Sequence, residues 1–467
     1  MLERLFKLQA NGTTVRRELV AGATTFMTMA YIIFVQPQVL MKPLMDGGLS
    51  EAAAVGAVLV ATCIAAALAT FMMGLLANYP IALAPGMGEN FFFVFTVCGT
   101  MAFTWQEGFL IVLISGVLFL GLTVLKVRKA IINAIPSSIK NAIAVGIGMF
   151  IAFIGLKEAG VIVIIKPPED PAFLTLGKVI SPPVLLATAG LVLTVALMVR
   201  RVPGGILLGI IGTAVLGLIA SQIGGAIDPK FAPLVEYQGV AAAPPSLRPT
   251  FFAFVHADFA NVLTGSFVAA VVIFLFMDMF YTMGTLVGVG ERAGFIVNNE
   301  LPRADRALLA DATGTVTGAM LGTSTVTSYI ESATGVEAGG RTGLANMATG
   351  VLFLLALLLS PLVKMIAAGY PHAGGFIHPV TAPALIIVGS MMMQVVTRIE
   401  WKDATEAVPA FLIMIGIPLT FSIANGFAFG FISYPAIKLV TGRGREVKPL
   451  LYVLAVLFVL YYIFFQP

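Results

Sequence analysis

The feature that most constrains this chain is the recurrence of apolar runs of about 20 residues, the length that an α-helix needs to cross a bilayer. Hydrophobic residues make up 59% of its 467 residues and charged residues only 11%, against roughly 25% charged residues in soluble domains. The sequence therefore predicts an all-α polytopic membrane protein of the cell (inner or plasma) membrane. It predicts no soluble domain, and the lipid bilayer is its expected surroundings.

About fourteen transmembrane segments are predicted, seven on each side of a long loop. Two of them, near 82–98 and 323–338, are short and Gly-rich, as half-crossings or broken helices would be. The others lie at roughly 18–41, 53–78, 106–125, 138–157, 181–199, 203–221, 264–290, 305–321, 343–367, 379–397, 405–421 and 425–441.

These runs predict five parts, which are an N-terminal amphipathic segment (1–17), a first seven-segment repeat (18–221), a long extracytoplasmic loop (222–263), a second repeat (264–441) and a C-terminal hydrophobic extension (442–467). The start of the chain lacks a signal-peptide cleavage site, and several short loops on its side are basic, so a cytoplasmic N-terminus is expected. The sequence leaves open whether the apolar run from Pro449 spans the membrane or lies at its interface.

An internal repeat is indicated by two similar stretches, "PSSIKNAIAVGIGM" from Pro136 and "PVTAPALIIVGSMM" from Pro379. Five of their fourteen positions coincide, although chance among Gly-rich helices is the alternative explanation. An odd number of spans in each half makes the second half inverted. Inverted repeats with interrupted segments in matching positions are typical of secondary transporters, whose sites lie where the broken helices meet.

Three acids, Glu89, Asp278 and Glu331, fall within these apolar or broken segments. A charged side chain inside a membrane span costs several kcal/mol, which makes each acid a candidate functional residue. Each also has a structural alternative. Asp278 could be a protonated acid capping a neighbouring helix, Glu331 could bond free N–H groups at a helix start, and Glu89 could face a water-filled vestibule.

Other polar residues are interpreted structurally. Asp311 is expected to be a structural acid near the cytoplasmic end of its span, and Glu337 is expected to pair with Arg341, four residues later. Two cysteines and three histidines form no pattern of metal-ligand spacing, so neither a metal nor a cofactor is expected. A net charge of +4 is small for this length, which argues against nucleic-acid binding.

Aromatic residues accompany both broken segments, with Phe91 after the first and Tyr329 before Glu331. By themselves such residues usually face lipid or the protein core. Beside carboxylates and Asn90, they suggest a flat aromatic ligand that stacks on a ring and is hydrogen-bonded at its edge.

Several motifs carry a resemblance to a known family, including "APGMGEN", "MDMFYTMGTLVGV", "LGTSTVTSYIESATGVEAGGRTG" and "PLTFSIANGFAFGFISY". The chain resembles the azaguanine-type hypoxanthine/guanine/adenine permeases of the nucleobase/ascorbate (xanthine/uracil permease) superfamily, over nearly its whole length. The resemblance implies two inverted sevens, a core domain that holds a purine at the broken third and tenth segments, and a gate domain. It also implies proton symport and dimerisation through the gate domain.

Position by position, the resemblance implies that Asn90, Asp278 and Glu331 match the family's polar residue, eighth-span acid and purine-binding acid. Two positions depart from the pattern. Where the family pattern reads "D-x-F-D-T", this chain has Tyr281 in place of the second acid. Where the family usually has an apolar residue before the asparagine, this chain has Glu89. We expect Glu331, Asn90, Tyr329, Asp278 and Phe91 to contact substrate, and Asp278, Tyr281 and Glu89 to couple protons, with the Tyr281 phenol donating to Asp278 one turn away.

The sequence thus predicts a secondary active transporter that imports a purine nucleobase with protons. The alternatives are a transporter of another nucleobase or of a small anion on the same fold, and a channel. An enzyme is not expected, because the histidines lie in or beside predicted loops and no serine stands in a nucleophile-elbow context.

Overall fold

The computed structural model describes residues 2–464 except 126–134, 165–173, 297–300 and 373–374. Its α-helices are α1 (Leu2–Phe6), α2 (Val15–Met29), α3 (Ile32–Asp46), α4 (Glu51–Met72), α5 (Met87–Phe91), α6 (Trp105–Val124), α8 (Ser137–Glu158), α9 (Pro182–Val199), α10 (Gly205–Ile227), α11 (Gly265–Ala293), α12 (Ala304–Leu321), α13 (Ser332–Glu337), α14 (Gly343–Ala356), α15 (Ser360–Ala367), α16 (Ala382–Met392), α17 (Ala404–Leu419), α18 (Ile423–Val440) and α19 (Pro449–Phe464).

Short strands and non-α helical pieces complete the chain. The strands are β1 (Leu83–Pro85), β2 (Ile162–Ile164), β3 (Leu174–Leu176), β4 (Val326–Ser328), β5 (Tyr370–His372) and β6 (Gly375–Ile377). They pair antiparallel as β1 with β4, β2 with β3 and β5 with β6. Two π-helical pieces (Met73–Ala77 and Phe92–Thr100) continue α4 and α5, and 3₁₀ turns lie at Ala253–His256, Phe259–Leu263, Leu357–Leu359, Met393–Arg398 and Gly444–Glu446.

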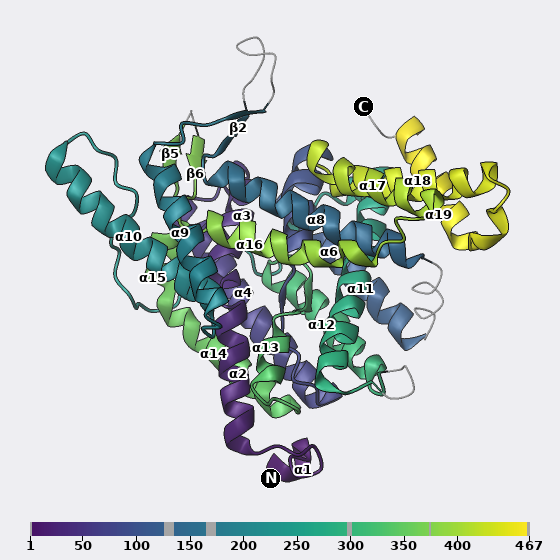
Figure 1. Cartoon of the computed structure of the whole chain (residues 1–467), viewed down its shortest axis with the longest axis horizontal. Coiled ribbons are helices and arrows are strands. Elements are labelled where there is room, and N and C mark those ends of the chain that lie inside the picture. The colour runs from purple at the N-terminus through teal and green to yellow at the C-terminus, as the bar shows by residue number, and fades with distance from the viewer. Residues whose placement is uncertain (1, 126–134, 165–173, 297–300, 373–374, 465–467) are drawn as a thin grey trace.

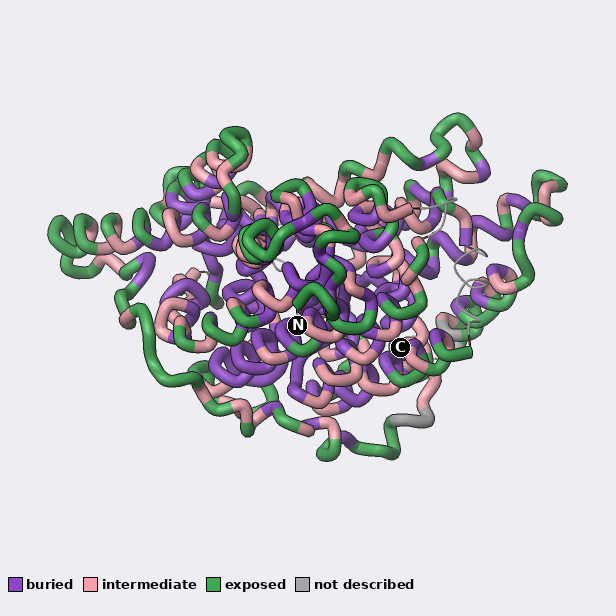
Figure 2. The backbone as a smooth tube through the Cα atoms, turned by 90° about the horizontal axis from the view of Figure 1, so that it is seen from below, coloured by how far each residue is buried: buried purple, intermediate pink, exposed green. Residues whose placement is uncertain are grey.

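The chain is a multi-pass membrane protein. Within the described residues, nine helical stretches are long and apolar enough to cross a bilayer, and shorter apolar helices accompany them. Figure 2 shows buried chain in the middle of the molecule and exposed chain at its periphery. Large apolar side chains such as Val192, Ile223 and Leu457 are exposed there. A surface of this kind is stable against lipid and not against water.

The helices form two groups that correspond to the core and gate domains of a seven-plus-seven inverted repeat. The core group contains α2–α6 and α11–α15, with α14 packed against α2 and α4, and α12 against α4 and α6. The gate group contains α8–α10 and α16–α18, and its α8 runs beside α16 across the molecule (Figure 1).

The repeated glycine motif lies where α8 and α16 cross. A Cβ on Gly389 would lie 2.4 Å from the carbonyl oxygen of Gly148, and a Cβ on Gly146 would lie 2.7 Å from Ile417 of α17. Any larger residue at Gly389 would push the two backbones apart. Gly146 and Gly389, which occupy the same position in the two similar stretches, therefore both allow helices of the gate group to approach closely.

Three parts of the chain differ from the expectation or complete it. The predicted amphipathic segment (1–17) is helical over α1, whose Phe6 packs near Leu344 at the start of α14, and its last three residues begin α2. The first span is interrupted between α2 and α3, at Ala30 and Tyr31. The C-terminal run forms α19, which packs on α18 with the rings of Phe431 and Phe458 stacked 5.9 Å apart.

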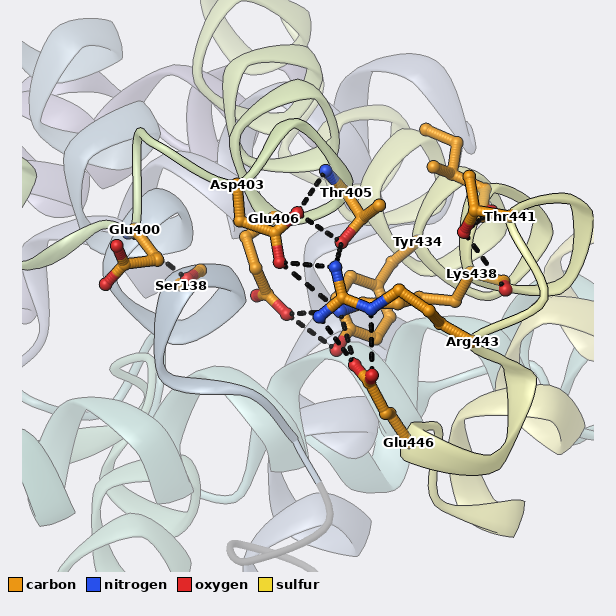
Figure 3. A network of polar contacts seen from close by, with 11 residues as sticks. Ser138, Glu400, Asp403, Thr405, Glu406, Tyr434, Lys438, Thr441, Arg443 and Glu446 are labelled. Atoms are coloured by element: carbon orange, nitrogen blue, oxygen red, sulfur yellow. Dashed lines mark hydrogen bonds and ion pairs between the residues drawn. The ribbon is translucent and has the colours of Figure 1, made fainter.

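A polar network joins α17, α18 and the turn before α19 (Figure 3). Lys438 is almost fully buried and pairs with Glu406 at 3.1 Å and Glu446 at 2.9 Å. Arg443 pairs with Asp403 at 2.7 Å and also with Glu446. Hydrogen bonds from Thr405 and Arg443 lower the pKa of Asp403 to about 2. Those from Arg443 and Lys438 lower the pKa of Glu446 to about 2.

Candidate functional site

The two broken segments meet at the β1–β4 pair in the middle of the core group. Leu83 faces Ser328 and Pro85 faces Val326, so the extended pieces satisfy each other's backbone groups. Outside the pair, Gly86 N–H donates to the carbonyl of Thr325 at 2.9 Å. Irregular backbone is tolerated at membrane depth only when protein groups satisfy it in this way. Because the pair is antiparallel, α5, with Glu89 and Asn90, and α13, with Glu331 at its start, begin at opposite ends of it.

Glu331 is buried at the N-cap of α13 and is held by the first span. The hydroxyl of Tyr31 donates to its Oε1 at 2.8 Å. Thr28, on the preceding turn of α2, shares a hydrogen bond of 3.0 Å with Thr334 of α13. Sequence reasoning missed Tyr31, because the residues at this break carry neither the glycine nor the proline that marked the other two breaks.

Asn90 is fully buried and links three parts of the core. Its Oδ1 accepts from Gln36 Nε2 of α3 at 3.0 Å and also from the hydroxyl of Ser324. Its Nδ2 donates to Gln36 Oε1, and Gln36 donates in turn to Thr323 at 2.8 Å. Gln36 is a second site residue that sequence reasoning missed. The Asn90 amide therefore ties the first span to both breaks.

The aromatic candidates lie on different sides of the site. The Tyr329 ring lies 6.5 Å from that of Tyr31, and its hydroxyl donates to the carbonyl of Pro85. Phe91 is buried among aromatic rings, 5.9 Å from both Phe95 and Phe150 of α8. Tyr329 therefore lies beside Glu331, whereas Phe91 lies at the contact between the core and gate groups.

Asp278 is buried on α11 and has an acidic neighbour that the sequence did not indicate. Its Oδ2 accepts from Thr315 of α12 at 2.8 Å, and its carboxyl group interacts with that of Asp311. Asp311 accepts from Thr282 at 2.6 Å and from Ser328 at 3.0 Å. The interpretation of Asp311 as a structural acid near the cytoplasmic end is therefore wrong, because this residue lies in the middle of the core.

The expected hydrogen bond from Tyr281 to Asp278 is also wrong. Asp278 turns toward α12, whereas the partly exposed Tyr281 has Glu331 and Glu89 as its electrostatic neighbours. The two side chains leave α11 in different directions although they are only one turn apart. Tyr281 thus lies between the acid of the tenth segment and the acid of the third.

Glu89 is fully buried, and neither of its oxygens receives a hydrogen bond from another residue. Its side chain folds over the backbone, because a Cβ on Gly86 would lie 2.2 Å from Glu89 Oε2. Its electrostatic neighbours include Asp278 and Asp311. Glu89 therefore lies within electrostatic range of the acid pair, with its carboxyl group folded over Gly86.

The site carries acids without cationic partners. Among the described residues, no Lys, Arg or His forms an ion pair with any of these four acids, which are Glu89, Asp278, Asp311 and Glu331. In the same part of the chain, no group of three His, Cys, Asp or Glu is arranged to hold a metal ion.

The expected pair between Glu337 and Arg341 is a further correction. Glu337 pairs with Arg292 at the end of α11 at 3.2 Å. Arg341 donates instead to the carbonyls of Val336 and Gly340, which close α13. The guanidinium of Arg341, which the spacing paired with Glu337, therefore binds free carbonyl groups at the end of this short helix.

Comparison with known proteins places this site in a family of transporters. Residues 16–429 match the family model Xan_ur_permease, a Permease family. A putative permease of Methanocaldococcus jannaschii is 48% identical over 99% of this chain and 98% of its own. The guanine/hypoxanthine permease PbuG of Bacillus subtilis is 43% identical over 100% of both chains. The adenine permease AdeP of Escherichia coli is 41% identical over 99% of this chain and 96% of its own.

Solved structures share the fold at low sequence identity. The transmembrane domain of the cyanobacterial bicarbonate transporter BicA has a TM-score of 0.60 at 14% identity, covering 88% of this chain and 97% of that one. A structure of SLC26A9 has a TM-score of 0.55 at 10% identity, covering 92% of this chain and 66% of that one. At these identities the likeness concerns the inverted-repeat architecture alone.

Proposed function

This chain belongs to the Permease family defined by the Xan_ur_permease model, and from that premise we propose that it imports purine nucleobases by proton symport. The observation that carries the proposal is full-length identity above 40% to permeases named for guanine, hypoxanthine and adenine. Their names favour a purine over another nucleobase. The buried acids at the crossing of the two breaks supply the chemistry that such a substrate requires.

Purine recognition is assigned to Glu331. A purine base presents ring N–H and exocyclic groups in one plane, and a carboxylate offers acceptors to them. Tyr31 already donates to Oε1, which leaves Oε2 and the remaining lone pair of Oε1 for the base. Tyr329 and Phe91 are assigned the aromatic surfaces against which the base packs, and Asn90 keeps the two breaks in register around it.

Proton coupling is assigned to Asp278 together with Asp311. Two neighbouring buried carboxyl groups cannot both be ionised without strong repulsion, so such a pair holds a shared proton. The hydroxyls of Thr315, Thr282 and Ser328 stabilise its single negative charge. Coupling then means that the core crosses the membrane with proton and purine both bound or with both released, and not with only one of them bound.

The same proposal includes the membrane, the orientation of the chain in it and the oligomeric state. We place the protein in the cell membrane with a cytoplasmic N-terminus, and we assign homodimerisation to the gate group, α8–α10 and α16–α18. The core group moves with its purine past this fixed frame. Lipid covers the exposed apolar side chains at the periphery.

An anion transporter is the second candidate, because the solved relatives of this fold include a bicarbonate transporter. Four buried acids that have no cationic partner within the described parts of the chain would repel an anion, which favours a neutral base. A channel is disfavoured by the paired breaks, since a channel needs a continuous polar pore.

Uptake of labelled hypoxanthine into proteoliposomes tests the proposal. We expect saturable uptake that unlabelled guanine or adenine reduces and that sulfate and bicarbonate do not. Competition by uracil or xanthine alone would move the assignment to another nucleobase. Competition by the anions alone, or currents without saturation, would contradict it.

A further inference from the structure

Glu89 is a buried acid that has no role in the proton coupling proposed for Asp278 and Asp311. Among the described residues, no other residue donates a hydrogen bond to either of its buried oxygens. By contrast, the other acids of the site receive hydroxyl donors, from Tyr31 on Glu331, from Thr315 on Asp278, and from Thr282 and Ser328 on Asp311. An ionised carboxylate that lacks donors costs several kcal/mol to bury in a membrane protein. Burial without such donors therefore favours the protonated, neutral form of the Glu89 carboxyl group.

Among the described residues, the neighbours of Glu89 include no cationic group that could neutralise it. On α11 its titratable neighbours are Asp278 and Tyr281, and on α12 its neighbour is Asp311. On α8, Ile147 faces the adjacent Gly88. The charged residues of α8 lie at its two ends, namely Lys140, Lys157 and Glu158. On α3 the neighbouring side chain is the neutral Gln36, which bonds Asn90.

The acid pair and Glu89 are two separate candidate proton sites. Within the pair, Asp278 Oδ1 and Asp311 Oδ2 are buried and have no hydrogen-bond partner among the described residues. Its remaining oxygens accept hydroxyl donors and stabilise one negative charge. Glu89 interacts with both aspartates, so an ionised Glu89 would add a second negative charge to the same low-dielectric region.

We propose that Glu89 is a second proton-carrying residue, so that this chain moves two protons with each purine. The proposal rests on the proposed function, since it adds a proton to that transport cycle. One proton belongs to the Asp278–Asp311 pair and the other to Glu89. Both leave when the core opens to the cytoplasm and water can solvate the carboxylates. Replacing the acid at position 89 by a neutral residue leaves a one-proton symporter.

The test measures steady-state purine accumulation in proteoliposomes as a function of an imposed pH gradient, with the membrane potential clamped at zero. Each coupled proton multiplies the accumulation ratio by about tenfold per pH unit. The accumulation ratio of the wild-type protein is expected to rise about a hundredfold per pH unit, and that of Glu89→Gln about tenfold per pH unit. Adding Asp278→Asn to Glu89→Gln should remove the dependence on pH altogether. Glu337→Gln, at an exposed acid paired with Arg292, is the matched control and should behave as wild type.

The outcomes separate this inference from the proposed function. If the wild-type protein accumulates no purine, the proposed function fails. If the accumulation ratio of the wild-type protein rises only about tenfold per pH unit and Glu89→Gln does not change this dependence, the second proton is refuted. Purine symport would still stand. Counterflow exchange without a gradient shows whether a variant is inserted and active. Glu89→Leu provides a second neutral variant and should also give the one-proton ratio.

Discussion

The phenol of Tyr31 donates a hydrogen bond of 2.8 Å to Oε1 of Glu331, across 300 positions of the chain. One residue lies at the interruption of the first span and the other at the start of α13. Thr28 and Thr334 connect the same two segments one turn further along. The orientation of the candidate purine-binding carboxylate is therefore set by another span as much as by its own.

Replacing Glu331 by Gln should abolish saturable purine uptake, because the amide presents a donor where the base needs an acceptor. The protein should still insert, which size-exclusion chromatography of a fluorescent fusion checks. Glu337→Gln, six residues later and exposed, is the control and should keep normal uptake. An unchanged KM for Glu331→Gln would remove this residue from the site.

Tyr31→Phe removes one hydroxyl and should raise the KM for purine by tenfold or more. A hydrogen bond to a charged group is worth about 1.5 to 3 kcal/mol, and about 1.4 kcal/mol corresponds to a factor of ten. Tyr79→Phe is a matched control, because that buried phenol accepts from the backbone N–H of Arg303 and lies elsewhere. In a Glu331→Gln background, Tyr31→Phe should have no further effect on residual binding. An additive loss there would show that Tyr31 acts independently of Glu331.

Asn90→Ala should weaken purine affinity or change the choice among purines, with a smaller loss than Glu331→Gln causes. Each neutral hydrogen bond is worth about 0.5 to 1.5 kcal/mol, and the substitution also leaves Gln36 with fewer partners in a buried place. A competition profile over hypoxanthine, guanine and adenine measures the effect. A profile and affinity identical to wild type would leave Asn90 with no part in recognition.

Asp278→Asn and Asp311→Asn should have the same effect on coupling, because each removes half of one shared proton site. Purine binding and counterflow exchange should persist, whereas accumulation driven by a pH gradient should fall by about tenfold per pH unit. Asp258→Asn, at an exposed cap in the long loop, is the control. Wild-type accumulation by either core variant would show that the proton takes another route.

Arg443→Gln should lower the melting temperature of the purified protein at neutral pH and not at strongly acidic pH. The pKa values of Asp403 and Glu446 are lowered from 3.8 and 4.5 to about 2. Carboxylates with lowered pKa values stabilise the fold fully above their ordinary values, and the contribution is lost as pH falls through about 2. Thermal unfolding at several pH values measures the difference between variant and wild type. A difference that stays undiminished at pH 2 would exclude the ion pairs as its cause.

Sequence patterns predicted the membrane spans and the two broken segments because both have local causes. A span needs a long apolar run, and a break within one needs residues such as Pro85 and Gly86 that cannot continue a helix. The interruption at Tyr31 has no such local mark. The spacing of Glu337 and Arg341 suited an ion pair, yet Arg292 reaches Glu337 from α11. A helical spacing shows which residues are neighbours on one helix. It does not show which side chains a neighbouring helix places beside them.

By itself, the sequence determined that this chain crosses the membrane repeatedly in two related halves, and that acids lie in segments where lipid tolerates few charges. Those properties follow from composition, length and local backbone preference. Only the tertiary structure decided which groups meet, with Asp311 beside Asp278, Tyr31 on Glu331, Gln36 on Asn90, and Glu89 without a donor. The physical reason is that these contacts depend on where helices from both halves cross at β1 and β4, and hydrophobic periodicity along one segment does not specify that crossing.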